Sequence, residues 1–270
     1  MSILGTILKH KREEIGDSVR STPIDELKAR IVDMDATKSF RDALVRKENS
    51  PINLIAEVKK ASPSKGLIRD NFNLSEIISV YHNKPVAAIS VLTDEKFFGG
   101  KLKYLREARK KTDKPLLRKD FIIDPYQVYE ARTNSADAIL LIAAALDKSQ
   151  LADLFGLAHE LSLDCLVEVH NYKELDAALY CGSEIIGINN RDLNTLDISL
   201  NVSLGLFKDV PSDRIIVSES GIASRKDVET MQEAGLDAIL VGSTIMKEKD
   251  MSAKIDELMG LTTDINIINS

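Results

Sequence analysis

Short apolar runs recur along the chain, and each is followed by a segment in which apolar and polar residues alternate with helical spacing. The runs begin roughly 20 to 32 residues apart, which suits a strand, a helix and the two turns that join them. Strands that are apolar on both faces and alternate with helices indicate a parallel sheet. The runs occupy residues 54–58, 86–92, 115–117, 138–142, 165–169, 185–188, 215–217 and 238–241.

The segments between the runs carry the chemistry of helix ends. In one segment an acidic N-cap residue precedes a proline, and in two others an acidic or amide N-cap residue precedes a glutamine or glutamate by three positions. In a fourth segment a glycine follows the helical pattern. These signals support helices between the strands. They are Asp124-Pro125, the pairs Asp147 with Gln150 and Asn171 with Glu174, and the segment from Ser224 to Gly235.

Eight strand–helix units within residues 51–250 predict a closed (β/α)8 barrel, the TIM barrel of the α/β class. An open doubly wound sheet would require a glycine-rich nucleotide turn after the first strand, and residues 62–66 do not match one. Residues 1–50 predict an N-terminal helical extension that packs across one end of the barrel, and residues 51–270 predict the barrel with a C-terminal helix, in a single domain. Helical patterns within the extension cover residues 3–14, 24–32 and 39–47.

Composition narrows the classes of function. Lys and Arg number 36 against 42 Asp and Glu, so the net charge of −6 favours neither nucleic acid nor an anionic membrane as a partner. No segment approaches the ~20 apolar residues of a membrane span. Cys165 and Cys181 are too few for a disulfide framework and lack metal-ligand spacing. We therefore expect a cytoplasmic protein, a monomer or weak homodimer, that acts on a small molecule.

Charged residues interrupt the first strand at its carboxyl end. Glu57 and Lys59 are two residues apart and therefore project from the same face. A buried structural salt bridge explains this pair as well as a functional site does. Active sites of (β/α)8 barrels gather at the carboxyl ends of the strands, so the other strands must decide between these interpretations.

Several further strands place polar residues at the same level of the inward face. A barrel built for stability alone would fill these layers with Val, Ile and Leu. The set therefore indicates an active site with carboxylates and lysines on one side and an apolar wall, including Leu140, on the other. The additional inward polar residues are Lys119, Glu168, Asn189 and Glu219.

Two turns of small residues follow the seventh and eighth strands. They are Ser220-Gly221-Ile222 and Gly242-Ser243-Thr244. Barrels often bind phosphate at this place through backbone N–H groups, and glycine allows the backbone to approach the anion closely. Each turn alone could be an ordinary tight connection, but the two together favour a phosphorylated substrate.

The motifs at these positions resemble those of the indole-3-glycerol-phosphate synthase family, in order and across nearly the whole chain. The matching segments are residues 7–14, 55–64, 97–100, 117–121, 166–170, 187–193, 219–222 and 242–243. The resemblance implies conversion of 1-(2-carboxyphenylamino)-1-deoxyribulose 5-phosphate to indole-3-glycerol phosphate, with release of CO2 and water. It implies no cofactor and no metal.

The resemblance also implies roles for individual residues. Lys119 is the general acid at the substrate ketone, Glu168 is the general base in the loss of water, and Lys59 contacts the substrate carboxylate. Whether Lys59 also donates a proton stays open, as does the sign of the pKa shift of Lys119, which burial lowers and nearby carboxylates raise. The remaining site residues are Glu57, Asn189 and Glu219 around the reacting centre, Ser62, Arg191, Ser220, Gly221, Gly242 and Ser243 for the substrate and its phosphate, and Phe98, Phe121 and Leu140 for the aryl ring.

Three other functions are compatible with parts of the pattern. A Schiff-base aldolase on the same fold would use Lys59 or Lys119 as a nucleophile. A phosphoribosylanthranilate isomerase would want a cysteine on the first strand, where this chain has Glu57. A non-catalytic phosphate-binding protein would not need Lys119 and Glu168 together. For His170, which follows Glu168 on the same face, we expect a structural or supporting role.

Overall fold

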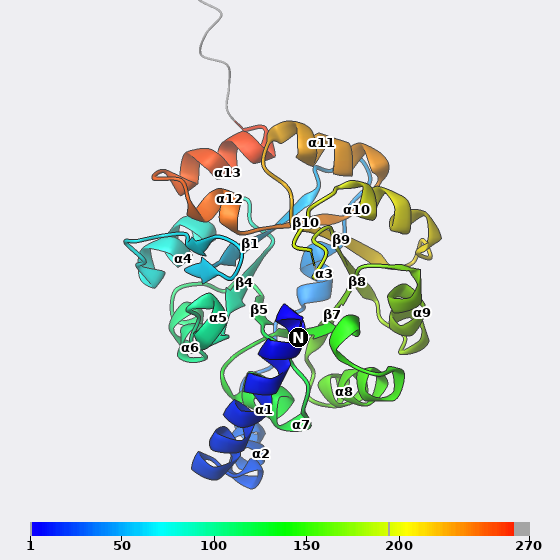
Figure 1. The fold of residues 1–270 in the computed structure, drawn as a ribbon. Helices are drawn as coiled ribbons and strands as arrows, with labels where there is room; N and C mark the ends of the chain where they lie inside the picture. Colours follow the sequence, from blue (N-terminus) through cyan, green and yellow to red (C-terminus); the bar gives the residue numbers. More distant parts are fainter. Residues whose placement is uncertain (1, 194, 262–270) are drawn as a thin grey trace, which may run out of the picture.

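Eight parallel strands close into a barrel in the computed structural model, which describes residues 2–193 and 195–261. The strands follow the chain order around the barrel, and β1 closes it by pairing with both β4 and β10. Figure 1 shows the helices arranged around this barrel. The predicted (β/α)8 architecture is thus confirmed. The barrel strands are β1 (Asn53–Val58), β4 (Ala88–Leu92), β5 (Leu116–Lys119), β6 (Ala138–Ile142), β7 (Asp164–Val169), β8 (Ile185–Asn189), β9 (Ile215–Glu219) and β10 (Ala238–Val241).

Three strands run further at their carboxyl ends than their apolar runs predicted, and one of them is β8, which extends to Asn189. β5 extends to Lys119, which pairs with Leu92, and β9 extends to Glu219, which pairs with Leu240. An apolar run ends at the first charged residue, but the backbone ladder continues as long as the neighbouring strand offers partners. These polar residues therefore belong to the rigid barrel wall and not to the loops that follow it.

Helices and short turns cover the outside of the barrel. Their starts follow the predicted signals, since Asp124 caps a helix with proline at its first position, Asp147 and Gln150 form a capping box, and Ser224 caps α11. The elements outside the extension are β2 (Ala61–Ser62), β3 (Gly66–Leu67), α4 (Leu74–Asn83), α5 (Glu95–Phe98), α6 (Lys103–Arg109), α7 (Pro125–Thr133), η1 (Ala143–Ala145), α8 (Lys148–Glu160), α9 (Tyr172–Tyr180), α10 (Asn201–Leu206), η2 (Phe207–Asp209), α11 (Arg225–Ala234), α12 (Ser243–Met246) and α13 (Met251–Met259). The rest of the predicted tail, from residue 262, lies outside the described residues.

The N-terminal extension contacts both ends of the barrel, whereas the sequence suggested one. It comprises α1 (Ile3–Ser21), α2 (Ile24–Val32) and α3 (Phe40–Leu44). α1 lies across the carboxyl ends of the strands, in front of the barrel in Figure 1, and α3 lies behind it. Phe40 and Leu44 of α3 are fully buried in the inner core, so this helix closes the amino end.

A buried lysine fixes α1 over the barrel. Lys11 is 1% exposed, and its Nζ lies 3.1 Å from Asp94 Oδ2 and 2.9 Å from Asp120 Oδ1. Asp94 follows β4 and Asp120 follows β5, so both carboxylates sit at the mouth. Burial lowers the pKa of Lys11, but the two aspartates outweigh it and hold that pKa above its usual value. The ion cluster thus orients α1 relative to the strand ends.

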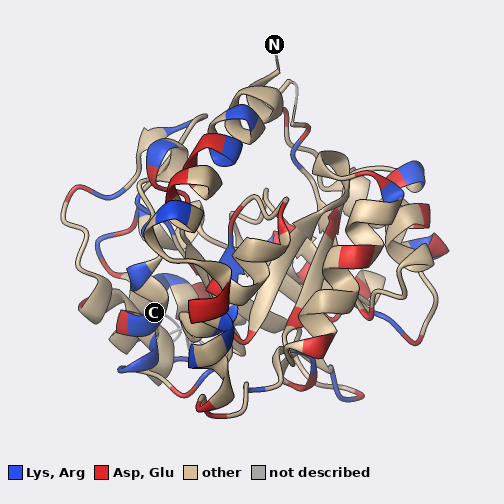
Figure 2. Cartoon of the chain, turned by 90° about the horizontal axis from the view of Figure 1, so that it is seen from below, with Lys and Arg blue, Asp and Glu red and all other residues tan. Residues whose placement is uncertain are grey.

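The structure contains no helix, among residues 2–193 and 195–261, that is long and apolar enough to span a bilayer. Figure 2 shows Lys and Arg interspersed with Asp and Glu over the surrounding helices.

Candidate active site

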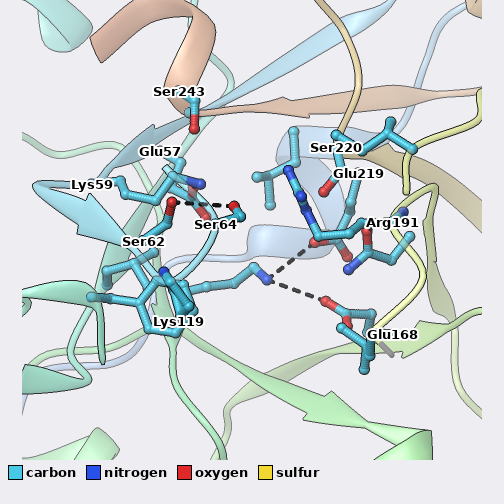
Figure 3. A pocket seen from close by; sticks show the side chains of 18 of the residues that line it. Glu57, Lys59, Ser62, Ser64, Lys119, Glu168, Arg191, Glu219, Ser220 and Ser243 are labelled. Carbon is cyan, nitrogen blue, oxygen red and sulfur yellow. Dashed lines mark hydrogen bonds and ion pairs between the residues drawn. The ribbon is translucent and has the colours of Figure 1, made fainter. Parts of the chain in front are cut away.

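A pocket of about 460 Å³ opens at the carboxyl ends of the barrel strands. Every residue that the sequence proposed for the site lines this pocket, although those residues come from many different elements. Figure 3 shows the polar members converging from opposite sides. Within the pocket are Glu57, Lys59, Ser62, Phe98, Lys119, Phe121, Leu140, Glu168, Asn189, Arg191, Glu219, Ser220, Gly221, Gly242 and Ser243.

Lys119 reaches across the pocket from the end of β5 and lies between two carboxylates. Its Nζ is 3.2 Å from Glu168 Oε2 and 3.3 Å from Glu219 Oε2 (Figure 3). Burial lowers the pKa of Lys119, but the carboxylates of Glu219, Glu168 and Glu57 outweigh that effect and raise the pKa above its usual value. Lys119 is therefore a charged hydrogen-bond donor at neutral pH, which settles the sign that the sequence left open.

The pKa values of the two carboxylates beside Lys119 are shifted in opposite directions. Burial raises the pKa of Glu168, yet Lys119 and His170 outweigh burial and hold it below its usual value. Burial raises the pKa of Glu219, and the negative charge of Glu168 raises it further. The pKa of Glu219 therefore reaches about 7, although Lys119 lowers it. One carboxylate is thus ionised at neutral pH while the other can carry a proton, the separation that acid–base chemistry uses.

Inward-facing glycines make room for two of the carboxylates. A Cβ at Gly187 would overlap Glu219 Oε1, and a Cβ at Gly242 would overlap Glu57 Oε1. Glu57 pairs with Lys59, which places the lysine beside the turn after β1. Glycine at these positions therefore serves the packing of functional side chains, a role that sequence analysis did not assign.

The turn after β9 has an uncommon backbone conformation, because a residue other than glycine has a positive φ in it. Ser220 and Gly221 both have left-handed conformations, with φ of 66° and 90°. Asn190 braces the turn, because its Nδ2 donates to the carbonyl oxygens of Glu219 and Ser220 at 3.0 Å each. Figure 3 places Ser220 and Ser243 on the same side of the pocket, away from Glu168.

Positive charge gathers around this side of the pocket. Burial lowers the pKa of Lys65, and the positive charges of Arg191, Lys59 and Lys247 lower it further. A bound anion would offset the repulsion that these three cations exert on Lys65. Ser62 lies beside them in the β2–β3 hairpin and accepts a hydrogen bond from the Lys65 backbone at 3.3 Å.

The opposite wall is apolar. The rings of Phe98 and Phe121 lie with their centroids 6.0 Å apart, and Leu140 completes this side of the barrel interior. Sequence analysis missed two further groups of lining residues. They are Ile3, Leu4 and Ile7 of α1, and Leu193, Leu196 and Ile198 after β8. The unpaired apolar positions of α1 were visible in the sequence, but not the end of the barrel that they cover.

No group of three or more potential ligands among the residues described could hold a metal ion. The ionisable side chains that line the pocket are lysines, carboxylates and Arg191. A closed (β/α)8 barrel with such ionisable side chains at the carboxyl ends of its strands belongs to the class of barrel enzymes.

Comparison with known proteins identifies the family within this class. The family model for indole-3-glycerol phosphate synthase matches residues 4–258. An indole-3-glycerol phosphate synthase of Alkaliphilus metalliredigens is 45% identical over 256 residues, which cover 95% of this chain and 97% of that protein. The chain belongs to the indole-3-glycerol phosphate synthase family and is a carbon–carbon lyase of tryptophan biosynthesis.

Solved structures with little sequence similarity share the fold. A 3-hexulose-6-phosphate synthase matches 78% of this chain and 100% of its own, with a TM-score of 0.62 and 15% identity. A mutant tryptophan synthase α-subunit from Pyrococcus furiosus matches 77% of this chain and 98% of its own, with a TM-score of 0.59 and 16% identity. At these identities the likeness concerns the barrel alone.

Proposed function

We propose that this chain closes the indole ring of 1-(2-carboxyphenylamino)-1-deoxyribulose 5-phosphate, with loss of CO2 and water, to give indole-3-glycerol phosphate. The observation that carries the proposal is the position of Lys119, a charged donor between Glu168 and Glu219. The same pocket has lysines and Arg191 near the turn after β9 on one side, and an apolar wall on the other. The three surroundings correspond to the ketone, the phosphate and the aryl ring of that substrate.

Ring closure comes first. When the aromatic carbon attacks the ketone carbon, the electron pair of the C=O bond moves to oxygen. Lys119 donates a proton to this oxygen as the charge develops, a contribution typically worth ~10²–10⁴-fold in rate. Because the lysine is already charged and oriented by two carboxylates, little reorganisation is needed in the transition state.

CO2 is then lost from the aromatic carbon that attacked, and the electron pair of the broken C–C bond restores the aromatic benzene ring. Lys59 contacts the substrate carboxylate, with Glu57 orienting the lysine through their ion pair. A strong ion pair with the substrate would stabilise the ground state and slow decarboxylation. The competing attraction of Glu57 weakens that pair, so Lys59 positions the carboxylate without holding the reaction back.

Loss of water then forms the double bond of the five-membered ring and completes the indole. Glu168 removes a proton from the intermediate while the hydroxyl leaves with a proton from a lysine. The low pKa of Glu168 keeps it ionised for this step, and Asn189 donates a hydrogen bond to its carboxylate. Glu219, with a pKa of about 7, can donate to or accept from a substrate hydroxyl.

Substrate orientation follows from the two walls. Ser62, Arg191, Ser220, Gly221, Gly242 and Ser243 hold the phosphate, where the left-handed turn and the nearby cations favour an anion. Phe98, Phe121 and Leu140 take the aryl ring. With its ends fixed at opposite walls, the substrate presents its ketone to Lys119.

A Schiff-base mechanism fits the site less well. A lysine nucleophile needs a lowered pKa, whereas that of Lys119 is raised. Borohydride trapping with a keto-phosphate should therefore leave no adduct on the protein, and a trapped lysine would favour the aldolase instead.

Turnover of the carboxyphenylamino substrate tests the proposal directly. Indole fluorescence reports the product, and the chain contains no Trp that would mask it. We expect emission to rise with time in the presence of folded protein. Absence of product from a preparation with a cooperative thermal transition would refute the proposal.

We further propose that the protein acts in the cytoplasm as a monomer or weak homodimer. Two free cysteines, Cys165 and Cys181, support a reducing compartment. Light scattering coupled to size exclusion should give a mass near 29.9 kDa or a concentration-dependent average above it.

A further inference from the structure

The start of α9 differs from the starts of α8 and α11. In α8 and α11 the side chain three residues into the helix returns to the backbone of the N-cap residue. Glu174 occupies this position in α9, but its Oε2 instead accepts hydrogen bonds from the backbone N of His170 at 2.8 Å and from His170 Nδ1 at 2.9 Å. Its Oε1 accepts from Asn171 Nδ2 at 2.7 Å. The helix start thus fixes an imidazole ring.

This contact determines which nitrogen of His170 is free to titrate. An ionised carboxylate only accepts hydrogen bonds, so Nδ1 carries a hydrogen and donates to Glu174. The other nitrogen, Nε2, lies 3.5 Å from Glu168 Oε1. Nε2 is buried and has no hydrogen-bond partner among the residues described. The ring therefore presents a single polar atom to the oxygen of Glu168 that Lys119 does not contact.

We propose that His170 is a positioning residue for Glu168, held by Glu174 so that its Nε2–H faces Glu168 Oε1 and keeps that carboxylate oriented and ionised. The inference rests on the proposed function, because it assigns to Glu168 the role of general base. It adds to that function a chain of contacts in which Glu174, at the start of α9, holds His170, and His170 faces Glu168 at the reacting centre.

The charges around His170 support a protonated ring. Burial lowers the pKa of His170, but Glu174 from α9, Glu168 from its own strand β7 and Glu219 from β9 raise it. The η1 turn (Ala143–Ala145), which packs against both β7 and α9, adds only alanines. The charged ring in turn lowers the pKa of Glu168.

Three variants separate orientation from charge. His170→Gln retains an amide donor without the positive charge, His170→Leu removes both, and Glu174→Gln leaves the ring but removes the charge that stabilises its protonated form. The matched control is Asp176→Asn, an exposed carboxylate on the same helix that pairs with Lys148. The pH dependence of kcat is measured for each by indole fluorescence.

The expected result is a displaced acid limb of the kcat profile. Without the positive charge of the His170 ring, the pKa of Glu168 rises even though Lys119 remains, so His170→Gln and Glu174→Gln should move the limb about one unit to higher pH. His170→Gln should approach wild-type kcat at alkaline pH. The kcat of His170→Leu should be about tenfold lower at every pH, because the residue that orients Glu168 is removed. Asp176→Asn should match wild type.

An acid limb that stays in place in both His170→Gln and Glu174→Gln would overturn the proposal, even if kcat fell, because a purely structural role does not move it. These two conservative variants decide the matter if His170→Leu fails to fold. Wild-type protein without turnover would refute the proposed function instead, so the two failures are distinguishable.

Discussion

The two ends of the barrel use the same strands for different purposes. At the amino end, the inward side chains are apolar and Phe40 and Leu44 of α3 close the interior. At the carboxyl end, the next inward residue of five strands is polar or glycine, and a pocket of about 460 Å³ remains. Thus Ile55 is followed by Glu57, Leu117 by Lys119, Leu166 by Glu168, Ile185 by Gly187 and Val217 by Glu219.

The difference shows where stability and function are located. The closed end buries apolar surface, which is the main favourable term in folding. The open end contains buried polar atoms, among them Glu219 Oε1 and Ser90 Oγ, that have no hydrogen-bond partner within the described part of the chain. Such atoms destabilise a fold. We infer that the closed end offsets the strain at the pocket, so variants at the two ends should affect different measurements.

The largest effect on catalysis is expected from Lys119→Met. Without a donor at the ketone oxygen, kcat should fall by about 10²–10⁴-fold. Lys59→Met should instead raise KM more than it lowers kcat, because Lys59 positions the carboxylate. Both are measured by indole fluorescence, with the exposed Lys111→Met as control. Equal losses of kcat in the two site variants would contradict the separate roles.

The matching effect at the closed end is expected from Phe40→Ala. Removal of a fully buried ring should lower the free energy of unfolding by about 3–5 kcal/mol. The turnover of the molecules that remain folded should change little. Urea denaturation measures the first quantity, and Val32→Ala, at an 81% exposed position, is the control. A loss of kcat without a loss of stability would blur the distinction between the two ends.

The fold and the composition of the site were predictable from the sequence for one physical reason. Successive side chains along a strand point to opposite faces. The residue two positions after an inward-facing Leu117 or Leu166 must therefore also face inward. Combined with the eight-fold repeat, this alternation places Lys119 and Glu168 at one mouth. The family resemblance supplied their chemical roles, which alternation alone does not give.

Two features could not be predicted because they depend on distances between remote segments. α1 lies over the mouth because Lys11 meets Asp94 and Asp120, residues far away in the chain. The opposite pKa shifts of Glu168 and Glu219 depend on the balance between burial and their neighbours. Residue types set the possible interactions, but only the three-dimensional arrangement determines which of them dominates.

A smaller effect is expected from Gly187→Ala, which adds one methyl group at the open end. Its Cβ would overlap Glu219 Oε1, so the carboxylate must move away from Lys119. We expect a loss of about tenfold in kcat/KM, since small displacements of a catalytic group are costly. Gly156→Ala in α8, where a Cβ meets nothing within 4 Å, is the control and should not lower activity. Unchanged kcat/KM in Gly187→Ala would show that the pocket tolerates the displacement.

The smallest effect concerns the pH dependence of stability and is tested with Glu219→Gln. The unfolded chain releases the Glu219 proton near the ordinary pKa, whereas the folded chain keeps it up to about pH 7. Between these values the folded state binds more protons, so this residue makes stability fall as pH rises. Glutamine removes the effect, and the stability of the variant relative to wild type should grow by about 1 kcal/mol from pH 5 to pH 6.

Urea denaturation at several pH values measures this difference. The matched control is Glu233→Gln on α11, which removes an exposed carboxylate far from the pocket lining. A Glu219→Gln difference that does not change with pH would mean that the open end does not carry the electrostatic strain that distinguishes it from the closed end. A difference that grows with pH would mean that burial of this single carboxylate lowers the free energy of unfolding at neutral pH.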